Sequence, residues 1–356
     1  MRLLFCGTPQ FAVPTLKHLL ALPNFEVLGV VTQPDRPRGR GQQVSVSPVK
    51  EVALAAHLPV HQPEKIRAPE VHQHLEKLAP DFIVIIAYGQ IIPARLLPIP
   101  KYGWINLHAS LLPKYRGAAP INWAIVNGET RTGLTTMRIN AGMDTGDILL
   151  QREMDIGPAE AAPELAARMS EAGAPLMEET LRGIAAGTIG PRPQNHAEAT
   201  LAPILKKEDG RIDWNRSAQE IYNRMRGFAP WPGAYTTFRG QTCHVLGEPA
   251  PPAALPGQSP PPPNLAPGTL FALGNILFVA CGRRSTTVVL SEARLLRSGR
   301  VYGAKDLNRP AGSTFPTDDA TLLRLQSVKL EGRKQVSAAE FVRGARLNPG
   351  ERFGDT

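Results

Sequence analysis

Cysteine is scarce in this chain of 356 residues. Cys6, Cys243 and Cys281 are widely spaced and form no CxxC pair, so the sequence predicts neither a disulfide framework nor a structural zinc site. Long apolar runs are missing too, since none approaches the roughly 20 residues that a membrane span needs. The N-terminal stretch 1–9 is broken too early by glycine and proline for a secretory signal peptide. We therefore expect a cytoplasmic protein without a membrane anchor.

Two patterns that would indicate a bound cofactor are also absent. Gly7 follows an expected strand, but no GxGxxG sequence accompanies it, so a dinucleotide site is not predicted. His72 and His74 lie two residues apart in an expected helix and face different directions, which makes them a poor metal pair. We expect no metal.

Charge, in contrast, is present in excess of one sign. The formal net charge is +9, of which +8 lies in residues 206–356 and only +1 in residues 1–205. Such an asymmetry between halves indicates a polyanion as the partner of the basic half.

The first half of the chain alternates short β-rich runs with helix-like segments. Several β-rich runs are almost entirely apolar, as in a sheet covered on both faces. The expected strands are 2–6, 26–32, 82–87, 103–108 and 133–139. The expected helices are 9–22, 48–57, 69–78 and 119–127, three of which open with proline. This pattern predicts an α/β domain, residues 1–186, with a doubly wound, mostly parallel Rossmann-like sheet.

The end of this domain is predicted from composition. Residues 163–186 are rich in Ala, Glu, Leu and Met and indicate a further helix, with a break or kink at 173–175 where glycine and proline occur. Residues 187–208 have several prolines and little periodicity, so we expect a linker there.

Residues 209–356 have a different texture. A short helix near 218–227 precedes Val-, Leu-, Thr- and Phe-containing runs separated by glycines, which predicts a small, OB-like β-barrel. The stretch 249–267 is packed with prolines and is expected to be an exposed loop insertion.

The residues best suited to chemistry lie in the segment 106–120 and the loop 142–147. Asn106 and His108 would project from the same face of a strand. An amide can donate to a developing oxyanion, and an imidazole can donate, accept or change charge near neutral pH. Asp144 lies between glycines that let the backbone turn tightly, and its carboxylate could orient the imidazole.

Motifs that carry a family resemblance are spread along almost the whole chain. They are FCGTP at 5–9, TQPDRP at 32–37, SPVK at 47–50, AYG at 87–89, the segment 106–120, GMDTGD at 142–147, RIDW at 211–214 and PWP at 230–232. On these motifs the chain resembles the methionyl-tRNA formyltransferases. The Asn, His and Asp set and the Ser-Leu-Leu-Pro loop are shared by a wider group of folate-dependent formyltransferases and hydrolases, so they indicate the chemistry and not the acceptor.

The resemblance implies that 10-formyltetrahydrofolate is the formyl donor and that neither a metal nor a covalent enzyme intermediate is needed. Asn106 and His108 would stabilise the oxyanion formed when an amine attacks the formyl carbon. Asp144 would assist proton removal and position His108. The residues expected to bind the folate are Ser110, Leu111, Leu112, Pro113, Ala87, Tyr88, Gly89 and Ile91.

The resemblance also implies that the acceptor is initiator methionyl-tRNA. The loop 36–43 is similar to the one with which the family grips the tRNA acceptor end, although Gln42 and Gln43 replace the family's usual lysines. The basic second half fits this acceptor, because tRNA binding gains affinity from neutralised phosphates. The residues expected to contact tRNA are Arg36, Arg38, Arg40, Lys206, Lys207 and Arg211, with Arg333, Lys334, Arg343 and Arg346 as further contributors.

Two alternatives stay open on the sequence. A formyltransferase acting on a small amine, such as a nucleotide sugar or a purine precursor, would be active without tRNA. The other alternative is a noncatalytic RNA-binding protein on a degenerate α/β scaffold. The intact Asn106, His108 and Asp144 argue against it. Nothing in the sequence demands more than a monomer.

Overall fold

The computed structural model describes residues 1–38, 43–250, 265–273, 276–282 and 322–354. The chain forms two compact units. Unit 1 comprises Met1–Ala124 and Glu129–Ile204, and unit 2 comprises Ile125–Gly128 and Leu205–Thr356.

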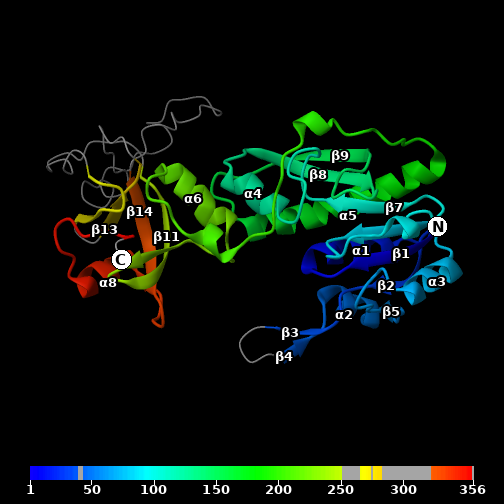
Figure 1. Cartoon of the computed structure of the whole chain (residues 1–356), viewed down its shortest axis with the longest axis horizontal. Helices are drawn as coiled ribbons and strands as arrows, with labels where there is room; N and C mark the ends of the chain where they lie inside the picture. Colours follow the sequence, from blue (N-terminus) through cyan, green and yellow to red (C-terminus); the bar gives the residue numbers. More distant parts are fainter. Residues whose placement is uncertain (39–42, 251–264, 274–275, 283–321, 355–356) are drawn as a thin grey trace. The chain divides into compact units, whose positions relative to one another are not determined.

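One sheet forms the centre of unit 1 (Figure 1). Its strands are β1 (Arg2–Gly7), β2 (Glu26–Val31), β5 (Val60–His61), β6 (Phe82–Ile86), β7 (Trp104–His108), β8 (Arg131–Arg138) and β9 (Ile148–Asp155). They are ordered β5-β2-β1-β6-β7-β8-β9, with parallel pairing from β5 to β7 and antiparallel pairing at β8 and β9. The predicted mostly parallel, Rossmann-like sheet is confirmed.

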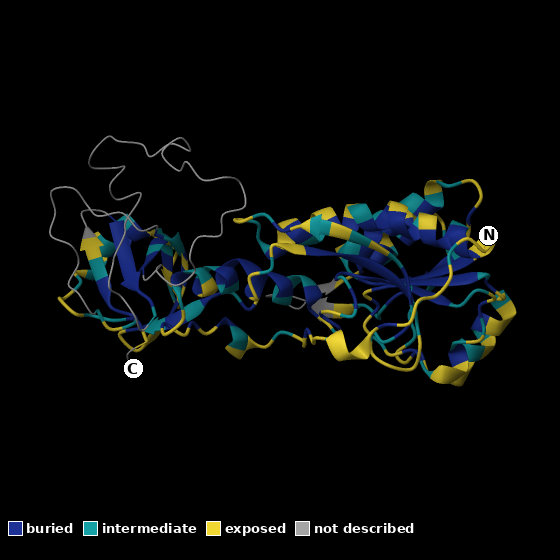
Figure 2. Ribbon diagram, turned by 90° about the horizontal axis from the view of Figure 1, so that it is seen from above, coloured by how far each residue is buried: buried dark blue, intermediate teal, exposed yellow. Residues whose placement is uncertain are grey.

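Helices cover both faces of this sheet (Figure 2), which explains why its central strand β6 is apolar and buried along its whole length. The helices are α1 (Val13–Ala21), α2 (Pro48–Ala55), α3 (Pro69–Leu78), α4 (Pro120–Val126) and α5 (Ala162–Ala186). Leu75 of α3 packs in one core cluster with Leu4 and Trp104. On the other face α5 approaches Leu107 so closely that a Cβ on Gly173 would lie 2.4 Å from the Leu107 Cδ2.

The helix α5 runs through Pro175 without interruption, so of the break or kink expected at 173–175 the break is wrong. A proline inside a helix removes one backbone hydrogen bond and costs about 3 kcal/mol. Here Gly173, Ala174, Leu176 and Met177 around it are all buried. Their packing against the sheet outweighs the local preference.

Four strands of unit 1 were not expected from the sequence. The short β5 pairs with β2. Strand β9 lies at the other sheet edge, where its residues alternate between partly buried and exposed after two buried positions. Strands β3 (Arg36–Arg38) and β4 (Gln43–Ser45) pair antiparallel as a β-hairpin, so both ends of the basic loop expected at 36–43 lie in strands.

The stretch 187–204 is tied to unit 1 by backbone pairing. Arg192 and Ile148 exchange two backbone hydrogen bonds of 2.8 Å. The Arg116 amide donates to the Thr200 carbonyl, and the Ala202 amide donates to the Arg116 carbonyl. We call residues 187–204 the strap.

Unit 2 contains the second sheet, whose described pairings are all antiparallel. Its strands are β10 (Tyr235–Phe238), β11 (Gln241–Pro249), β12 (Leu270–Leu273), β13 (Ile276–Ala280), β14 (Leu322–Leu330) and β15 (Val336–Ser337). They follow the order β10-β11-β14-β13-β12, with β15 against β14. Most of the proline-rich insertion lies outside the described residues.

Among the described residues, two helices accompany this sheet, α6 (Ala218–Gly227) and α8 (Ala338–Ala345). Each is preceded by a serine, Ser217 or Ser337, whose side chain accepts from the backbone amide of a glutamate three residues on, while that carboxylate accepts from the serine amide. These capping boxes explain where the helices start, and the predicted helix near 218–227 is confirmed.

Candidate active site

Asn106 and His108 lie on β7 and share one face of the sheet. Because Leu107 between them faces α5, the two polar side chains face away from that helix. Asn106 is the one residue of β7 that is not buried. Among the described residues no hydrogen bond involves its side-chain amide, which is thus available to a ligand.

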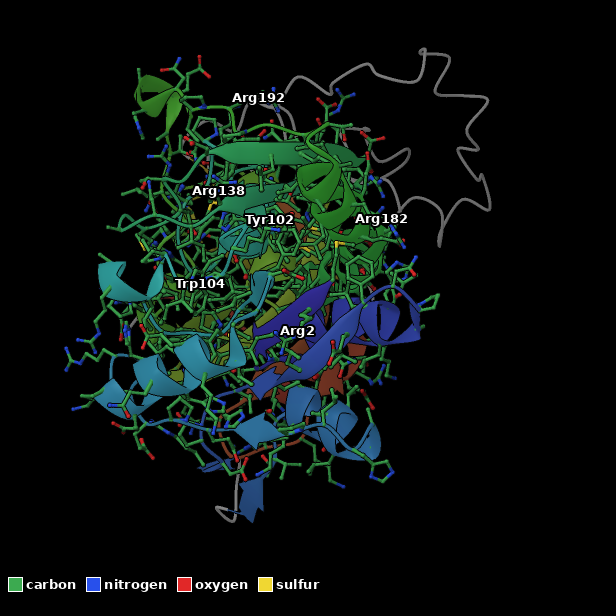
Figure 3. All side chains as sticks on the ribbon, turned by 90° about the vertical axis from the view of Figure 1, so that its right-hand side faces the viewer. Arg2, Tyr102, Trp104, Arg138, Arg182 and Arg192 are labelled. Carbon is green, nitrogen blue, oxygen red and sulfur yellow. The ribbon has the colours of Figure 1, made fainter. Side chains whose placement is uncertain are left out.

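His108 ends its strand at the carboxyl edge of the sheet. Figure 3 looks at the opposite edge, where Arg2 and Trp104 begin β1 and β7 and Arg138 ends the antiparallel β8. In doubly wound sheets ligands bind beyond the carboxyl ends of the strands, so the His108 edge is the expected place for a site.

The His108 ring is buried, with 6% of the residue exposed. Its Nε2 lies 2.9 Å from the Tyr115 carbonyl, which can only accept, so Nε2 carries a proton and donates. Its Nδ1 faces the Asp144 Oδ2 at 3.7 Å, beyond hydrogen-bond distance. The structure thus brings His108 and Asp144 together and leaves Nδ1 as the nitrogen that faces the carboxylate.

Asp144 occupies an unusual backbone conformation, with φ of 52°. Its Oδ2 accepts from the Gly117 amide at 2.8 Å. The loop around it turns on Asn140, whose side chain accepts from the Gly142 amide. A Cβ at Gly146 would lie 1.7 Å from the Arg138 carbonyl oxygen, so only glycine fits there. The glycines therefore permit the backbone approach that the sequence indicated.

The segment Ser110 to Pro113 follows β7 and is held by side chains of the antiparallel strands. The Thr135 hydroxyl donates to the Ser110 carbonyl at 2.6 Å and accepts from the Leu112 amide at 3.1 Å. Gln151 donates to the Leu112 carbonyl at 2.9 Å. Ser110 and Leu112 are buried, while Leu111 and Pro113 are partly exposed. Sequence analysis missed Thr135 and Gln151, because neither lies in a motif.

The segment Ala87 to Ile91 follows β6 at the same edge of the sheet. Ala87 has φ of 48°, and both Ala87 and Gly89 are exposed. Tyr88 is buried, and its carbonyl accepts from the Gln33 side chain at 2.9 Å. Ile91 is 81% exposed, an unusual position for a large apolar side chain.

A buried hydrogen-bond network of side chains supports the backbone of the Asp144 loop. Arg116 donates through Nε and Nη2 to the Gln194 Oε1 at 3.0 and 2.6 Å. The Gln194 Nε2 donates to the Asp144 and Gly146 carbonyls at 2.9 and 2.6 Å. Gln194 belongs to the strap, and no sequence signal distinguished it from the residues around it.

Comparison of the sequence with known proteins shows which family the chain belongs to. Residues 1–181 match the formyl transferase family, and residues 204–310 match the formyl transferase C-terminal domain. A methionyl-tRNA formyltransferase of Solibacter usitatus is 48% identical over 100% of this chain and 99% of its own length. One of Acidobacterium capsulatum is 49% identical over 99% of this chain and 100% of its own length. The chain belongs to the methionyl-tRNA formyltransferase family.

A solved structure shares the fold of this family member. WlaRD, a sugar 3N-formyl transferase crystallised in the presence of dTDP and 5-N-formyl-THF, aligns with a TM-score of 0.57 at 15% identity. The alignment covers 94% of this chain and 99% of that one. At this identity the likeness concerns the fold alone.

The basic hairpin of this family member lies after β2 and extends away from the sheet of unit 1 (Figure 1). Arg36 at its base is exposed and lies 3.7 Å from Glu64. Arg38 falls in β3, and Arg40 lies outside the described residues. Asp35 forms an ion pair with Lys50, which with the Gln62 amide lowers the pKa of that carboxyl.

The expected tRNA-contact residues of unit 2 are all exposed. They are Lys206, Lys207, Arg211, Arg333, Lys334, Arg343 and Arg346. The segment 206–211 lies against the PWP motif, since a Cβ at Gly210 would meet the Gly233 carbonyl at 2.1 Å and Pro232 at 3.2 Å. The middle residue of that motif, Trp231, is 55% exposed.

Other kinds of site are not found in the described part of the chain. It contains no group of three or more His, Cys, Asp or Glu residues that could hold a metal ion. No helix there is long and apolar enough to cross a membrane. All three cysteines are buried, and burial raises the pKa of each thiol.

Proposed function

We propose that this protein transfers the formyl group of 10-formyltetrahydrofolate to the α-amino group of methionine on initiator tRNA. The observation that carries the proposal is the convergence of His108 and Asp144 at the end of β7, in a chain that matches methionyl-tRNA formyltransferases from end to end. We further propose that it acts as a monomer in the cytoplasm.

The reaction begins when the amine lone pair attacks the formyl carbon and the carbonyl electron pair moves to oxygen. Asn106 donates to this oxyanion, as its partly exposed amide has no partner among the described residues. As the imidazolium, which carries a proton on both ring nitrogens, His108 donates to the same oxyanion through Nδ1, because its Nε2–H is already held by the Tyr115 carbonyl. Asp144 accepts the proton that the amine loses.

The intermediate then collapses, breaking the bond between the formyl carbon and N10 of the folate. N10 gains a proton as the amine loses one, so the products are the formylated amine and tetrahydrofolate. Proximity, charge stabilisation and a proton route are sufficient, since a deprotonated amine is already a nucleophile.

The folate would lie along the segments 110–113 and 87–91. Backbone groups at Ala87 and Gly89 are exposed at the carboxyl edge of the sheet, and the hydrogen bonds of Thr135 fix the other segment. The solvent-exposed side chain of Ile91 offers an apolar surface for the pterin or its linker.

For tRNA we propose two contact regions. Arg36 and Arg38 of β3, together with Arg40, would meet the acceptor end, and the surface of unit 2 around 206–211 would neutralise phosphates. Trp231 lies beside this surface, and an exposed indole can stack on an unpaired base. We thus assign catalysis to residues 1–186 and tRNA affinity mainly to residues 206–356.

The test is transfer of labelled formyl from 10-formyltetrahydrofolate to methionine-charged initiator tRNA. Uncharged tRNA, free methionine and an amino-sugar nucleotide serve as alternative acceptors in parallel reactions. We expect label only on the charged tRNA. Label on the sugar nucleotide without tRNA would replace the proposal with the small-amine alternative, and no label with any acceptor would contradict formyl transfer.

A further inference from the structure

The side chain of Gln194 connects Arg116 with the backbone of the 144–146 loop. It comes from the strap, some 50 residues after the Asp144 loop, and is 6% exposed. Its amide nitrogen donates to the Asp144 and Gly146 carbonyls, and its amide oxygen accepts twice from Arg116. The orientation of the amide is set by these neighbours, because carbonyls only accept and a guanidinium only donates.

Arg116 lies between the two backbone groups that hold His108 and Asp144. The carbonyl of the preceding residue, Tyr115, accepts from the His108 Nε2. The amide of the following residue, Gly117, donates to the Asp144 Oδ2. The contacts therefore form a closed loop, in which Gln194 connects the segment 115–117 back to the Asp144 backbone.

The conformation of Asp144 explains why such a support is needed. A non-glycine residue with φ near +52° is disfavoured and persists only where its surroundings determine it. Gln194 binds the carbonyl of Asp144 itself and the carbonyl two residues later. It thus fixes the loop at the residue that carries the carboxylate and directly after it.

The residue type fits this double role. A carboxylate at position 194 would pair more strongly with the buried guanidinium of Arg116, but it could not donate to two carbonyls. An amide satisfies both sides. His196 also contacts Arg116, with its Nδ1 at 3.1 Å from the Nη2 that donates to Gln194.

We propose that Gln194 is a positioning residue for formyl transfer, holding the Asp144 carboxylate against His108 through the backbone of the 144–146 loop. This role rests on the proposed function, because it assumes that Asp144 takes part in the reaction. It predicts a defect in the chemical step and not in substrate binding.

The first test compares Gln194→Leu and Gln194→Glu with the wild-type full chain. Each should lower kcat about ten- to a hundredfold, the range that a misplaced catalytic group costs, while KM for charged tRNA changes less than about twofold. Gln194→Glu keeps a hydrogen-bond acceptor for Arg116, so this variant tests the proposal even if Gln194→Leu does not fold. Asn195→Ala is the matched control, because its exposed amide bonds only to Ala197 and Glu198 within its own turn, and should leave kcat unchanged. Equal losses in kcat for Asn195→Ala and Gln194→Glu would contradict the proposal.

A double-mutant cycle separates positioning from a general loss of structure. In an Asp144→Asn background, Gln194→Glu should cost less than about threefold further, because the group it positions is already gone. A full additive loss would overturn the proposal.

A readout without turnover distinguishes this inference from the proposed function. Hydrogen exchange at the Gly117 amide, which donates to Asp144, should be faster by about tenfold or more in Gln194→Glu than in wild type. Unchanged exchange would contradict the positioning role even if the enzyme formylates tRNA. If exchange is faster but the protein formylates no acceptor, the result supports the role of Gln194 in holding the loop and contradicts only the proposed function.

Discussion

The region proposed for chemistry and the surface proposed for tRNA are built in opposite ways. His108, Arg116 and Gln194 are buried, and each has hydrogen bonds to neighbouring groups. The cationic residues of the segment 206–211 and Trp231 are exposed. A developing oxyanion is stabilised most by groups that are already in place, whereas a polyanion is bound by charges at the surface that can adapt to it. Catalysis and tRNA affinity should therefore be separable by mutation.

The largest effect is expected in the buried region. Replacing His108 or Asp144 by alanine should lower kcat by about 10² to 10⁴, because each removes charge stabilisation or proton transfer in the transition state. Affinity for tRNA, measured by filter binding, should remain near that of wild type. Near-normal turnover in both variants would place the chemistry elsewhere.

The second-largest effect is expected from the side chain that holds the proposed folate-binding segment 110–113. Thr135→Val removes the hydroxyl that holds both Ser110 and Leu112, so KM for 10-formyltetrahydrofolate should rise about tenfold. Thr136→Val is the matched control, since Thr136 follows on the same strand and its hydroxyl bonds instead to Thr180 of α5 and to the Leu150 backbone of β9. Steady-state kinetics with varied folate distinguish the two, and an equal rise of KM in both variants would show a general loss of stability.

Substitutions in the exposed surface of unit 2 should change a different quantity, the dependence of tRNA binding on salt concentration. A Lys206→Ala, Lys207→Ala double variant should reduce the slope of log K against log salt by about 0.7 to 0.9 for each phosphate that is no longer neutralised. Trp231→Ala should weaken binding about tenfold with the slope unchanged, because stacking involves no counterion release. Lys17→Ala, an exposed lysine of α1, is the control. A slope that stays constant in the double variant would remove this surface from the tRNA site.

The base of the hairpin should give the smallest effect. Lys50 and Gln62 hold the pKa of Asp35 below its ordinary value, so the ionised form is favoured in the folded state. The resulting stability is present above the unfolded pKa, about 4, and is lost as pH falls through the lowered folded value. Lys50→Met should therefore destabilise the protein at pH 7 and have less effect near pH 3, as measured by urea unfolding. The same loss at both pH values would show that the ion pair is not its source.

The sequence predicted the parts of the fold that depend on local pattern. The apolar runs identified β1, β2, β6, β7 and β8, and prolines marked the starts of α2 and α3. It missed β5, which has only two residues, and β9, whose alternation is half polar. It also predicted a break at Pro175 that tertiary packing prevents.

The candidate site was predicted only where residue type and spacing carry meaning. Asn106 and His108 follow from the period of a strand, and Asp144 from its glycines. Thr135, Gln151, Arg116 and Gln194 act through side-chain contacts between positions 16 to 80 apart, for which a single sequence has no signal. The family resemblance indicated what the site does, and the structure shows what supports it.

The most direct test of the account is single-turnover transfer of labelled formyl from 10-formyltetrahydrofolate to saturating methionine-charged initiator tRNA. Wild type, Asp144→Ala and the Lys206→Ala, Lys207→Ala double variant are compared. The account predicts rapid transfer by wild type, transfer slowed by about 10² or more in Asp144→Ala, and an almost normal rate in the double variant once tRNA is saturating. Transfer by Asp144→Ala at the wild-type rate, or no transfer to charged tRNA by wild type, would contradict it.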